Sequence, residues 1–143
     1  MFADLRVLVV DDETDFLEMT VKRMQKKGID TVGVMSGNEA VEKISNENFD
    51  VVLLDVKMPG MDGIETLREI KRVKPLVEVI MLTGHASVES GIEGMKLGAF
   101  DYLMKPMELD KILETIQDAH KKKQLQEEKI IQAQIKRDLA RPC

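Results

Sequence analysis

Cysteine and long apolar runs are scarce in this chain, and each scarcity excludes a class of protein. The 143 residues include one cysteine, Cys143, which rules out an internal disulfide and suits a reducing compartment. No apolar run approaches the roughly 20 residues of a membrane-spanning helix. The N-terminal MFADLRVLVVDDE has one arginine followed by acids and lacks a small-residue cleavage site, unlike a secretory signal peptide. We therefore expect a cytoplasmic protein with no membrane segment.

Histidine and glycine-rich loops are also sparse. The only histidines, His85 and His120, have no partners at metal-ligand spacing, so we assign neither a metal-binding nor a catalytic role. Neither a GxGxxG nor a Walker-type loop follows any strand-like run, which disfavours nucleotide binding.

The net charge of −5 is unevenly distributed along the chain. Residues 121–143 carry seven Lys/Arg against three Asp/Glu, a balance of +4, which leaves −9 for residues 1–120. An acidic body of this kind argues against direct nucleic-acid binding by the domain.

Five strand-like runs alternate with amphipathic helical patterns over residues 1–120. The expected strands are LRVLVV (5–10), TVGVM (31–35), VVLL (51–54), VEVIML (77–82) and FDYLM (100–104). The first, third and fourth are almost continuously apolar, as in central strands covered on both faces, whereas the other two are mixed, which favours sheet edges. Alternating βα units predict one α/β domain with a doubly wound, five-stranded parallel sheet and five helices.

The five helices are predicted from apolar residues at helical spacing. Their apolar faces are Leu17, Val21 and Met24; Ala40, Val41 and Ile44; Ile64, Leu67 and Ile70; Val88, Ile92 and Met95; and Leu109, Ile112, Leu113 and Ile116. Gly28 offers a stop for the first helix, and Ser36 to Glu39 form a capping box for the second. The fourth, at about 86–96, contains Gly91 and Gly94, which each cost on the order of 1 kcal/mol relative to alanine. We therefore expect the fourth helix to be the loosest.

Polar side chains follow the predicted strands at their carboxyl ends, where doubly wound sheets bind ligands. They are Asp11, Asp12, Asp55, Thr83 and Lys105. Three carboxylates in one pocket repel one another unless a cation is present, and Mg²⁺ is a hard cation that takes carboxylate and phosphate oxygens. Thr83 and Lys105 suit the oxygens of an anion instead. Together these groups are typical of phosphoryl transfer, with Asp55 as the nucleophile that becomes an aspartyl phosphate.

Each of these residues also has an ordinary structural role when it is considered alone. Asp11, Asp12 and Asp55 can begin loops or cap helices, and Thr83 can cap the fourth helix. Lys105 can be a solvated loop lysine. The combination on successive strand ends is what favours a shared site.

Four segments, VLVVDDE, VVLLDVKMPGMDG, IMLTGHAS and GAFDYLMKP, occur in order and at compatible spacing. With them, residues 4 to about 120 resemble the receiver domain of a two-component response regulator. The resemblance implies a flavodoxin-like receiver over residues 1–120 with strand order 2-1-3-4-5. It also implies the following roles: phosphoacceptor, Asp55; Mg²⁺ ligands, Asp11, Asp12, Asp55 and the backbone carbonyl of Lys57; phosphoryl-binding groups, Thr83 and Lys105; aromatic switch, Tyr102; and a cis bond before Pro106.

The same resemblance implies a phosphoaccepting switch rather than a turnover enzyme. A histidine kinase or phosphotransfer protein would be the phosphodonor and Mg²⁺ the cofactor. The phosphoryl group adds about −1.5 to −2 charges at pH 7, and contacts with Thr83 and Lys105 would shift an equilibrium between two packings. A downstream protein would then read the face made by the fourth helix, the fifth strand and the fifth helix.

Two other functions compete with this one. The first is a protein-docking module that has the receiver fold but is not phosphorylated in the cell; the intact acid pair, Thr83 and Lys105 argue against it. The second is a phosphohydrolase of the haloacid dehalogenase type, which also forms an aspartyl phosphate. That family has a second aspartate two residues after the nucleophile, where this chain has Lys57.

Residues 121–143, KKKQLQEEKIIQAQIKRDLARPC, are strong helix formers up to Pro142. Their apolar residues Leu125, Ile131, Ile135 and Leu139 show no sustained heptad. We expect a basic helical extension or linker, in the simplest case a solvated continuation of the fifth helix. The alternative is a short helix that docks on a partner or pairs with a second copy, giving a homodimer. The segment is too short for a DNA-binding module, so we expect a stand-alone receiver rather than a piece of a longer chain.

Overall fold

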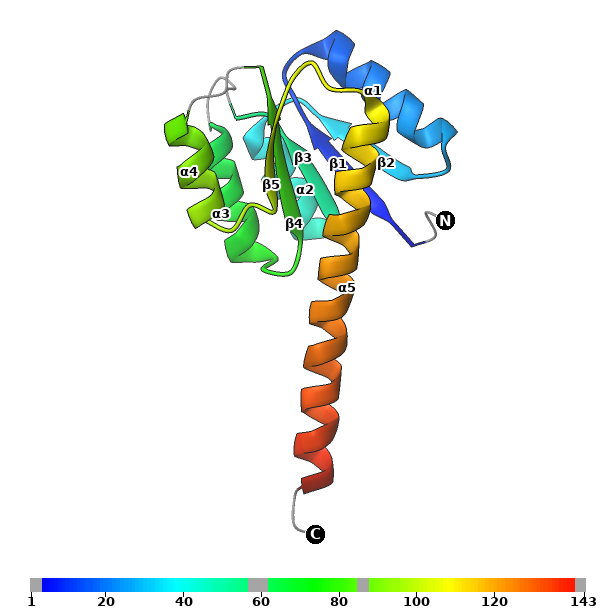
Figure 1. The fold of residues 1–143 in the computed structure, drawn as a ribbon, viewed down its shortest axis with the longest axis vertical. Coiled ribbons are helices and arrows are strands. Elements are labelled where there is room, and N and C mark those ends of the chain that lie inside the picture. Colours follow the sequence, from blue (N-terminus) through cyan, green and yellow to red (C-terminus); the bar gives the residue numbers. More distant parts are fainter. Residues whose placement is uncertain (1–3, 57–61, 85–87, 141–143) are drawn as a thin grey trace.

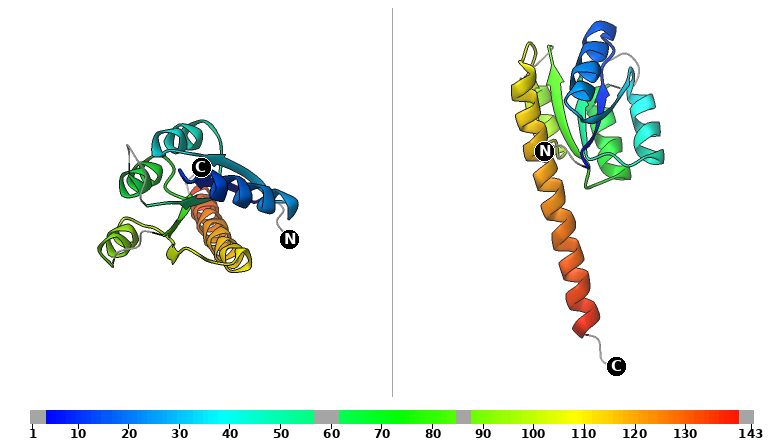
Figure 2. Two further views of the ribbon diagram at one scale, coloured as in Figure 1. Left: turned by 90° about the horizontal axis from the view of Figure 1, so that it is seen from above. Right: turned by 90° about the vertical axis from the view of Figure 1, so that its right-hand side faces the viewer.

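A five-stranded parallel sheet lies between two layers of helices (Figure 1) in the computed structural model, which describes residues 4–56, 62–84 and 88–140. The strand order is β2-β1-β3-β4-β5, as predicted. The strands are β1 Arg6–Val10, β2 Asp30–Val34, β3 Val51–Leu54, β4 Glu78–Thr83 and β5 Asp101–Met104. The helices are α1 Thr14–Lys26, α2 Gly37–Asn46, α3 Gly63–Val73, α4 Val88–Lys96 and α5 Leu109–Ala140. Helices α1 and α5 cover one face of the sheet, and α2, α3 and α4 cover the other (Figure 2).

The core divides into two clusters, one on each face of the sheet. Every residue of β3 and β4 is buried, as expected for central strands, whereas β2 and β5 form the edges. The capping box of α2 is present in part, because the Ser36 side chain accepts a hydrogen bond from Glu39 N. Val41 and Leu109, predicted to be buried, are half-buried. Among the described helices, none has the length and apolar content of a membrane span.

Helix α4 differs from the prediction in the face that it turns to the sheet. Ile92 and Met95 are 51% and 48% exposed, so they do not form a buried face as their spacing predicted. The glycines lie inward instead: a Cβ on Gly94 would overlap Met81 Sδ, and one on Gly91 would lie 3.5 Å from the Tyr102 ring. The apolar pattern was misleading here because a glycine on the inner face leaves no hydrophobic signal, yet allows the helix to approach the sheet closely. The predicted looseness of α4 stays a prediction.

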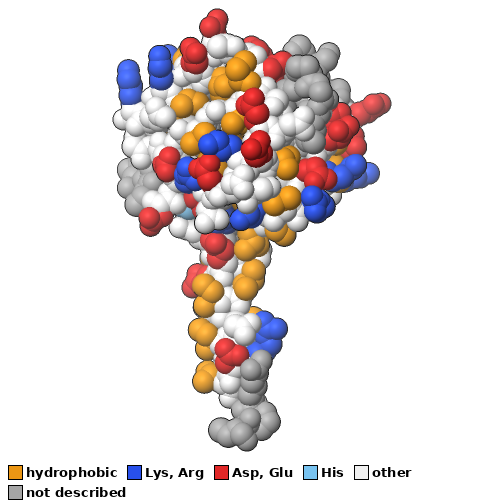
Figure 3. All heavy atoms as spheres, turned by 180° about the vertical axis from the view of Figure 1, so that it is seen from behind, with side chains coloured by type: hydrophobic (Ala, Val, Ile, Leu, Met, Phe, Trp, Pro, Cys, Tyr) orange, Lys and Arg blue, Asp and Glu red, His pale blue; other side chains and the backbone are white. Residues whose placement is uncertain are grey.

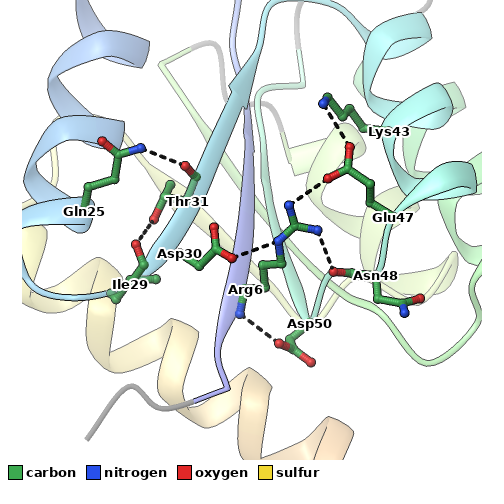
Figure 4. Close-up of polar contacts among 9 residues, drawn as sticks. All are labelled: Arg6, Gln25, Ile29, Asp30, Thr31, Lys43, Glu47, Asn48 and Asp50. Carbon is green, nitrogen blue, oxygen red and sulfur yellow. Dashed lines mark hydrogen bonds and ion pairs between the residues drawn. The ribbon is translucent and has the colours of Figure 1, made fainter.

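A cluster of ion pairs around Arg6 connects the amino-terminal ends of neighbouring strands (Figure 4). Its guanidinium lies 3.0 Å from Asp30 and 2.7 Å from Glu47, and it also donates to the carbonyl of Asn48. Arg6 N donates to Asp50 Oδ2 at 2.8 Å. These bonds join β1, β2 and the segment between α2 and β3.

Helix α5 continues past the sheet as a protruding stem (Figures 1 and 2). Ile112, Leu113 and Ile116 pack in the core, as predicted. From residue 121 to Ala140, almost every residue is exposed. The expected continuation of the fifth helix is therefore present.

Candidate functional site

The carboxyl ends of β1 and β3 place two aspartates side by side in the fold. Asp11 N donates to Val34 O, and Asp55 N donates to Val10 O, so the main chain of both residues extends the strand ladder. Each aspartate is only 2% exposed. A buried carboxylate needs a cation or hydrogen-bond donors, because desolvation of an isolated charge is costly. The position of both acids at strand ends therefore requires compensating groups nearby.

Asp11, Asp12 and Asp55 form one acidic cluster, as predicted. Each offers a carboxylate oxygen, and these three atoms all lie within 4.8 Å of one another. Oxygen donors at this density, two of them on buried residues, fit a hard divalent cation such as Mg²⁺. The fourth predicted ligand, the carbonyl of Lys57, lies outside the described residues.

Lys105 supplies the positive charge at this cluster. Its Nζ lies 2.6 Å from Asp11 Oδ2, 3.2 Å from Glu13 Oε1 and 3.8 Å from Asp55 Oδ2. It also lies 4.0 Å from the centre of the Phe16 ring, within cation–π range. Lys105, predicted to face a phosphoryl group, thus makes the shortest of these three contacts with Asp11, a member of the acidic cluster.

Asp11 and Lys105 each have a pKa that differs from the ordinary value of the side chain. Burial raises the pKa of Asp11, and the hydrogen bond from Lys105 offsets only part of that rise. Burial lowers the pKa of Lys105, but the hydrogen bond and charge of Asp11, together with the charge of Asp55, outweigh it and leave this pKa above its ordinary value. Lys105 therefore keeps its positive charge at neutral pH, and this charge lies 2.6 Å from a carboxylate of the acidic cluster.

Thr83 and Tyr102 come from β4 and β5. Thr83 is fully buried at the end of its strand, and its carbonyl accepts a hydrogen bond from Lys105 N at 3.0 Å. Tyr102 is half-buried and packs beside Gly91 of α4. The Lys105–Pro106 bond is cis, as predicted. The carboxyl ends of the strands thus bring Asp11, Asp55, Thr83 and Lys105 together. Tyr102 lies within β5, three residues before Lys105, on the side of α4.

Three residues of the site were missed at the level of sequence. Glu13 and Phe16 both contact Lys105; the acidic run DDE hinted at Glu13, but no pattern marked Phe16. Gly63 begins α3 and donates a hydrogen bond to Val56 O at 2.7 Å. A Cβ on Gly63 would lie 2.6 Å from Asp55 O, so this residue must be small for α3 to pack against the Asp55 backbone.

The family comparison agrees with this geometry. Residues 7–117 match the response regulator receiver domain model, and the chain therefore belongs to that family. The transcriptional regulatory protein ZraR of Escherichia coli (strain K12) is 38% identical over 116 residues, which are 81% of this chain and 26% of ZraR. The chain thus spans about a quarter of the length of the curated relatives that it matches first.

Solved structures share the same fold. A receiver domain protein (CheY-like) from Methanospirillum hungatei JF-1 has a TM-score of 0.83 and 33% identity, covering 85% of this chain and 98% of its own. A response regulator from Burkholderia pseudomallei has a TM-score of 0.76 and 25% identity, covering 87% of this chain and 73% of its own. The latter was solved with a phosphorylated aspartic acid, a calcium ion and citrate.

Proposed function

We propose that this chain is a phosphoaccepting switch in two-component signalling, with Asp55 as the phosphoacceptor. The observation that carries the proposal is the placement of buried Asp55 within a cluster of three carboxylate oxygens and 3.8 Å from the Lys105 ammonium. An isolated buried carboxylate would be protonated or unstable, but one that faces cations can act as a nucleophile at neutral pH.

The reaction is a transfer of one phosphoryl group. An Asp55 carboxylate oxygen forms a bond to phosphorus, and the phosphorus–nitrogen bond of a phosphohistidine on the donor protein breaks. The released imidazole retains the electron pair of that bond and takes up a proton. The chain modifies only its own side chain, so we propose a signalling protein rather than a turnover enzyme. A histidine kinase or phosphotransfer protein of the cytoplasm is the proposed donor.

Asp11, Asp12 and Asp55 are the described residues that would hold Mg²⁺. When bound, the cation neutralises charge between the carboxylates and the incoming phosphoryl oxygens. Lys105 has to exchange its contact with Asp11 for contact with the phosphoryl oxygens, a movement across a short distance because Asp11 and Asp55 already share it. The Burkholderia pseudomallei relative was solved with both a phosphorylated aspartic acid and a calcium ion, which supports the proposal of a cation in this family's acidic site.

The output surface that we propose includes α4, β5 and α5. Phosphorylation adds about −1.5 to −2 charges at pH 7, which Thr83 and Lys105 can contact only in the modified state. Tyr102 lies in β5 with its ring next to Gly91 of α4, where a Cβ on that glycine would come within 3.5 Å of the ring. On the solvent side, Ile92, Met95 and Met104 are about half exposed, which suits recognition by a protein partner.

Intact-mass measurement tests the proposal. After incubation with acetyl phosphate and Mg²⁺, we expect a gain of one phosphoryl unit, which is lost in Asp55→Asn and after chelation of the metal. Asp118→Asn, at an exposed position of α5, is the control and should be modified like the wild type. An unmodified wild-type chain would favour the docking module, and release of phosphate from free phosphomonoesters would favour a phosphohydrolase.

A further inference from the structure

The side chain of Lys105 is largely withdrawn from water. Lysine and arginine side chains extend from the surface of the domain in Figure 3, as long solvated cations usually do. The Lys105 side chain is instead only 11% exposed. A buried ammonium is costly unless neighbouring groups compensate its charge, so the groups around Lys105 determine where it can lie.

Two groups around Lys105 come from the beginning of α1 and lie outside the three-carboxylate cluster. Glu13 Oε1 lies 3.2 Å from Lys105 Nζ, and the centre of the Phe16 ring lies 4.0 Å from the same nitrogen. We refer to Glu13 and Phe16 as the α1 pair. The ammonium thus has the α1 pair on one side and the carboxylates of Asp11 and Asp55 on the other.

The start of α1 fixes the position of the α1 pair. Glu13 is the N-cap residue of α1, and its carbonyl accepts a hydrogen bond from Leu17 N at 2.9 Å. The N–H of Glu13 donates to Asp11 Oδ1, also at 2.9 Å. Phe16 follows three residues later, at a spacing that places two side chains on the same face of a helix. The segment that carries the acidic cluster therefore also orients the α1 pair.

The α1 pair differs from Asp11 in that a divalent cation at the acidic cluster does not claim it. Asp11 is both a member of that cluster and the nearest carboxylate to Lys105. When a cation takes the Asp11 carboxylate, Lys105 loses its shortest ionic contact. Glu13 and Phe16 then remain to hold the ammonium on the side of α1, away from Asp55.

Phe16 is the stronger member of the α1 pair. The side chain of Glu13 is 57% exposed, and water screens an ion pair of this kind. A cation–π contact is stronger where the cation is withdrawn from water, as Lys105 is, and the Phe16 ring is itself half-buried. The ring also carries no net charge, so it attracts the ammonium without repelling a phosphoryl group.

We propose that Phe16, assisted by Glu13, is a positioning residue that holds Lys105 in its unphosphorylated position and thereby slows phosphorylation. The inference rests on the proposed function of Asp55. Lys105 Nζ has to leave the ring face when it moves to the phosphoryl oxygens, so the cation–π contact stabilises the unphosphorylated state more than the phosphorylated one. An interaction that differs between two states shifts the equilibrium between them. A weaker contact therefore releases Lys105 more easily.

NMR of the unphosphorylated whole chain tests the position of Lys105 independently of any chemistry at Asp55. Protons above the face of an aromatic ring resonate upfield, so we expect the Lys105 Hε resonances upfield of those of the other lysines. Phe16→Leu should return them to the ordinary position, and Phe16→Tyr, which keeps a ring, should preserve the upfield shift. Ordinary Lys105 resonances in the wild type, or the same resonances in Phe16→Leu, would overturn the proposal.

The rate of phosphorylation tests the consequence of this contact. Fluorine draws electron density from the ring face and weakens cation–π attraction while it nearly preserves the size of the ring. With 3,4,5-trifluorophenylalanine at position 16, we expect acetyl phosphate and Mg²⁺ to modify the chain about threefold faster, and 4-fluorophenylalanine should have an intermediate effect. The same substitution at Phe49, whose ring lies 4.4 Å from Arg6 Cζ, is the control and should leave the rate unchanged.

The outcomes separate this inference from the proposed function. A wild type that is modified at the same rate as the chain fluorinated at position 16, or faster, would overturn the role of Phe16 and leave Asp55 as the phosphoacceptor. Equal acceleration by fluorination at positions 16 and 49 would also overturn it. A wild type that acetyl phosphate does not modify at all would overturn the proposed function and this inference together.

Discussion

Lys105 Nζ lies closer to Asp11 Oδ2, at 2.6 Å, than to Asp55 Oδ2, at 3.8 Å. In this arrangement the ammonium of Lys105 occupies part of the space beside Asp11 that a divalent cation needs. It also neutralises part of the carboxylate charge that would attract that cation. We infer that Mg²⁺ binding and the release of Lys105 from Asp11 are coupled events.

This coupling predicts the effect of removing the ammonium on metal affinity. Lys105→Met should bind Mg²⁺ about tenfold more tightly, because one competing and repelling charge is lost. Isothermal titration calorimetry measures the affinity, and Lys111→Met, at an exposed position of α5, is the control. Unchanged or weaker binding in Lys105→Met would show that the lysine does not compete with the metal.

Gly63→Ala tests the close packing of α3 behind the phosphoacceptor. The new methyl group would collide with the main chain of Asp55 and Val56, which cannot move as a flexible side chain can. We expect a loss of about 3 kcal/mol of unfolding free energy and slower phosphorylation of Asp55. Gly91→Ala is the control, since its methyl group meets Tyr102 at an ordinary contact distance and should change stability by less than about 1 kcal/mol. Similar stabilities of the two variants would contradict this packing.

Lys71 is predicted to stabilise the amino-terminal end of β4 and the segment that leads into it. Its Nζ donates to Pro75 O and Val77 O, both at 2.9 Å, and lies 3.6 Å from Glu78, whose side chain is almost fully buried. Lys71→Met leaves these acceptors without that donor, so we expect a loss of about 2 kcal/mol in urea unfolding. Lys96→Met, at an exposed position of α4, should cost less than about 0.5 kcal/mol. Equal costs would mean that the carbonyls of Pro75 and Val77 and the carboxylate of Glu78 are satisfied in another way.

The Arg6 cluster makes a prediction about acid. Hydrogen bonds from Arg6 and then Lys43 hold the pKa of Glu47 below its ordinary value of 4.5. A lowered pKa contributes stability that is present above 4.5 and is lost as pH falls through the folded-state pKa. Glu47→Gln should therefore be less stable than the wild type at pH 7, and the difference should shrink below pH 4.5. The urea midpoints of the wild type and of Glu47→Gln, measured from pH 7 to below pH 4.5, check this prediction. A stability difference that stays constant with pH would show that the charge of Glu47 is not its cause.

Much of this fold follows from patterns that the sequence states directly. The continuous apolar runs at 51–54 and 77–82 predicted central strands, and the acids and Lys105 after the strands predicted one shared edge. The buried face of α4 was predicted wrongly because Gly91 and Gly94 form it. These glycines let the helix approach the sheet closely but add little apolar surface. Phe16 was missed because a single ring gains its role only when β5 brings Lys105 over it.

The most direct measurement of the central claim locates the phosphoryl group itself. The chain is incubated with acetyl phosphate and Mg²⁺ and then reduced with borohydride, which converts an aspartyl phosphate to homoserine, and peptide masses identify the altered residue. The account predicts homoserine at position 55 and nowhere else. Reduction at Asp11 or Asp12, or a chain with no altered residue, would contradict it.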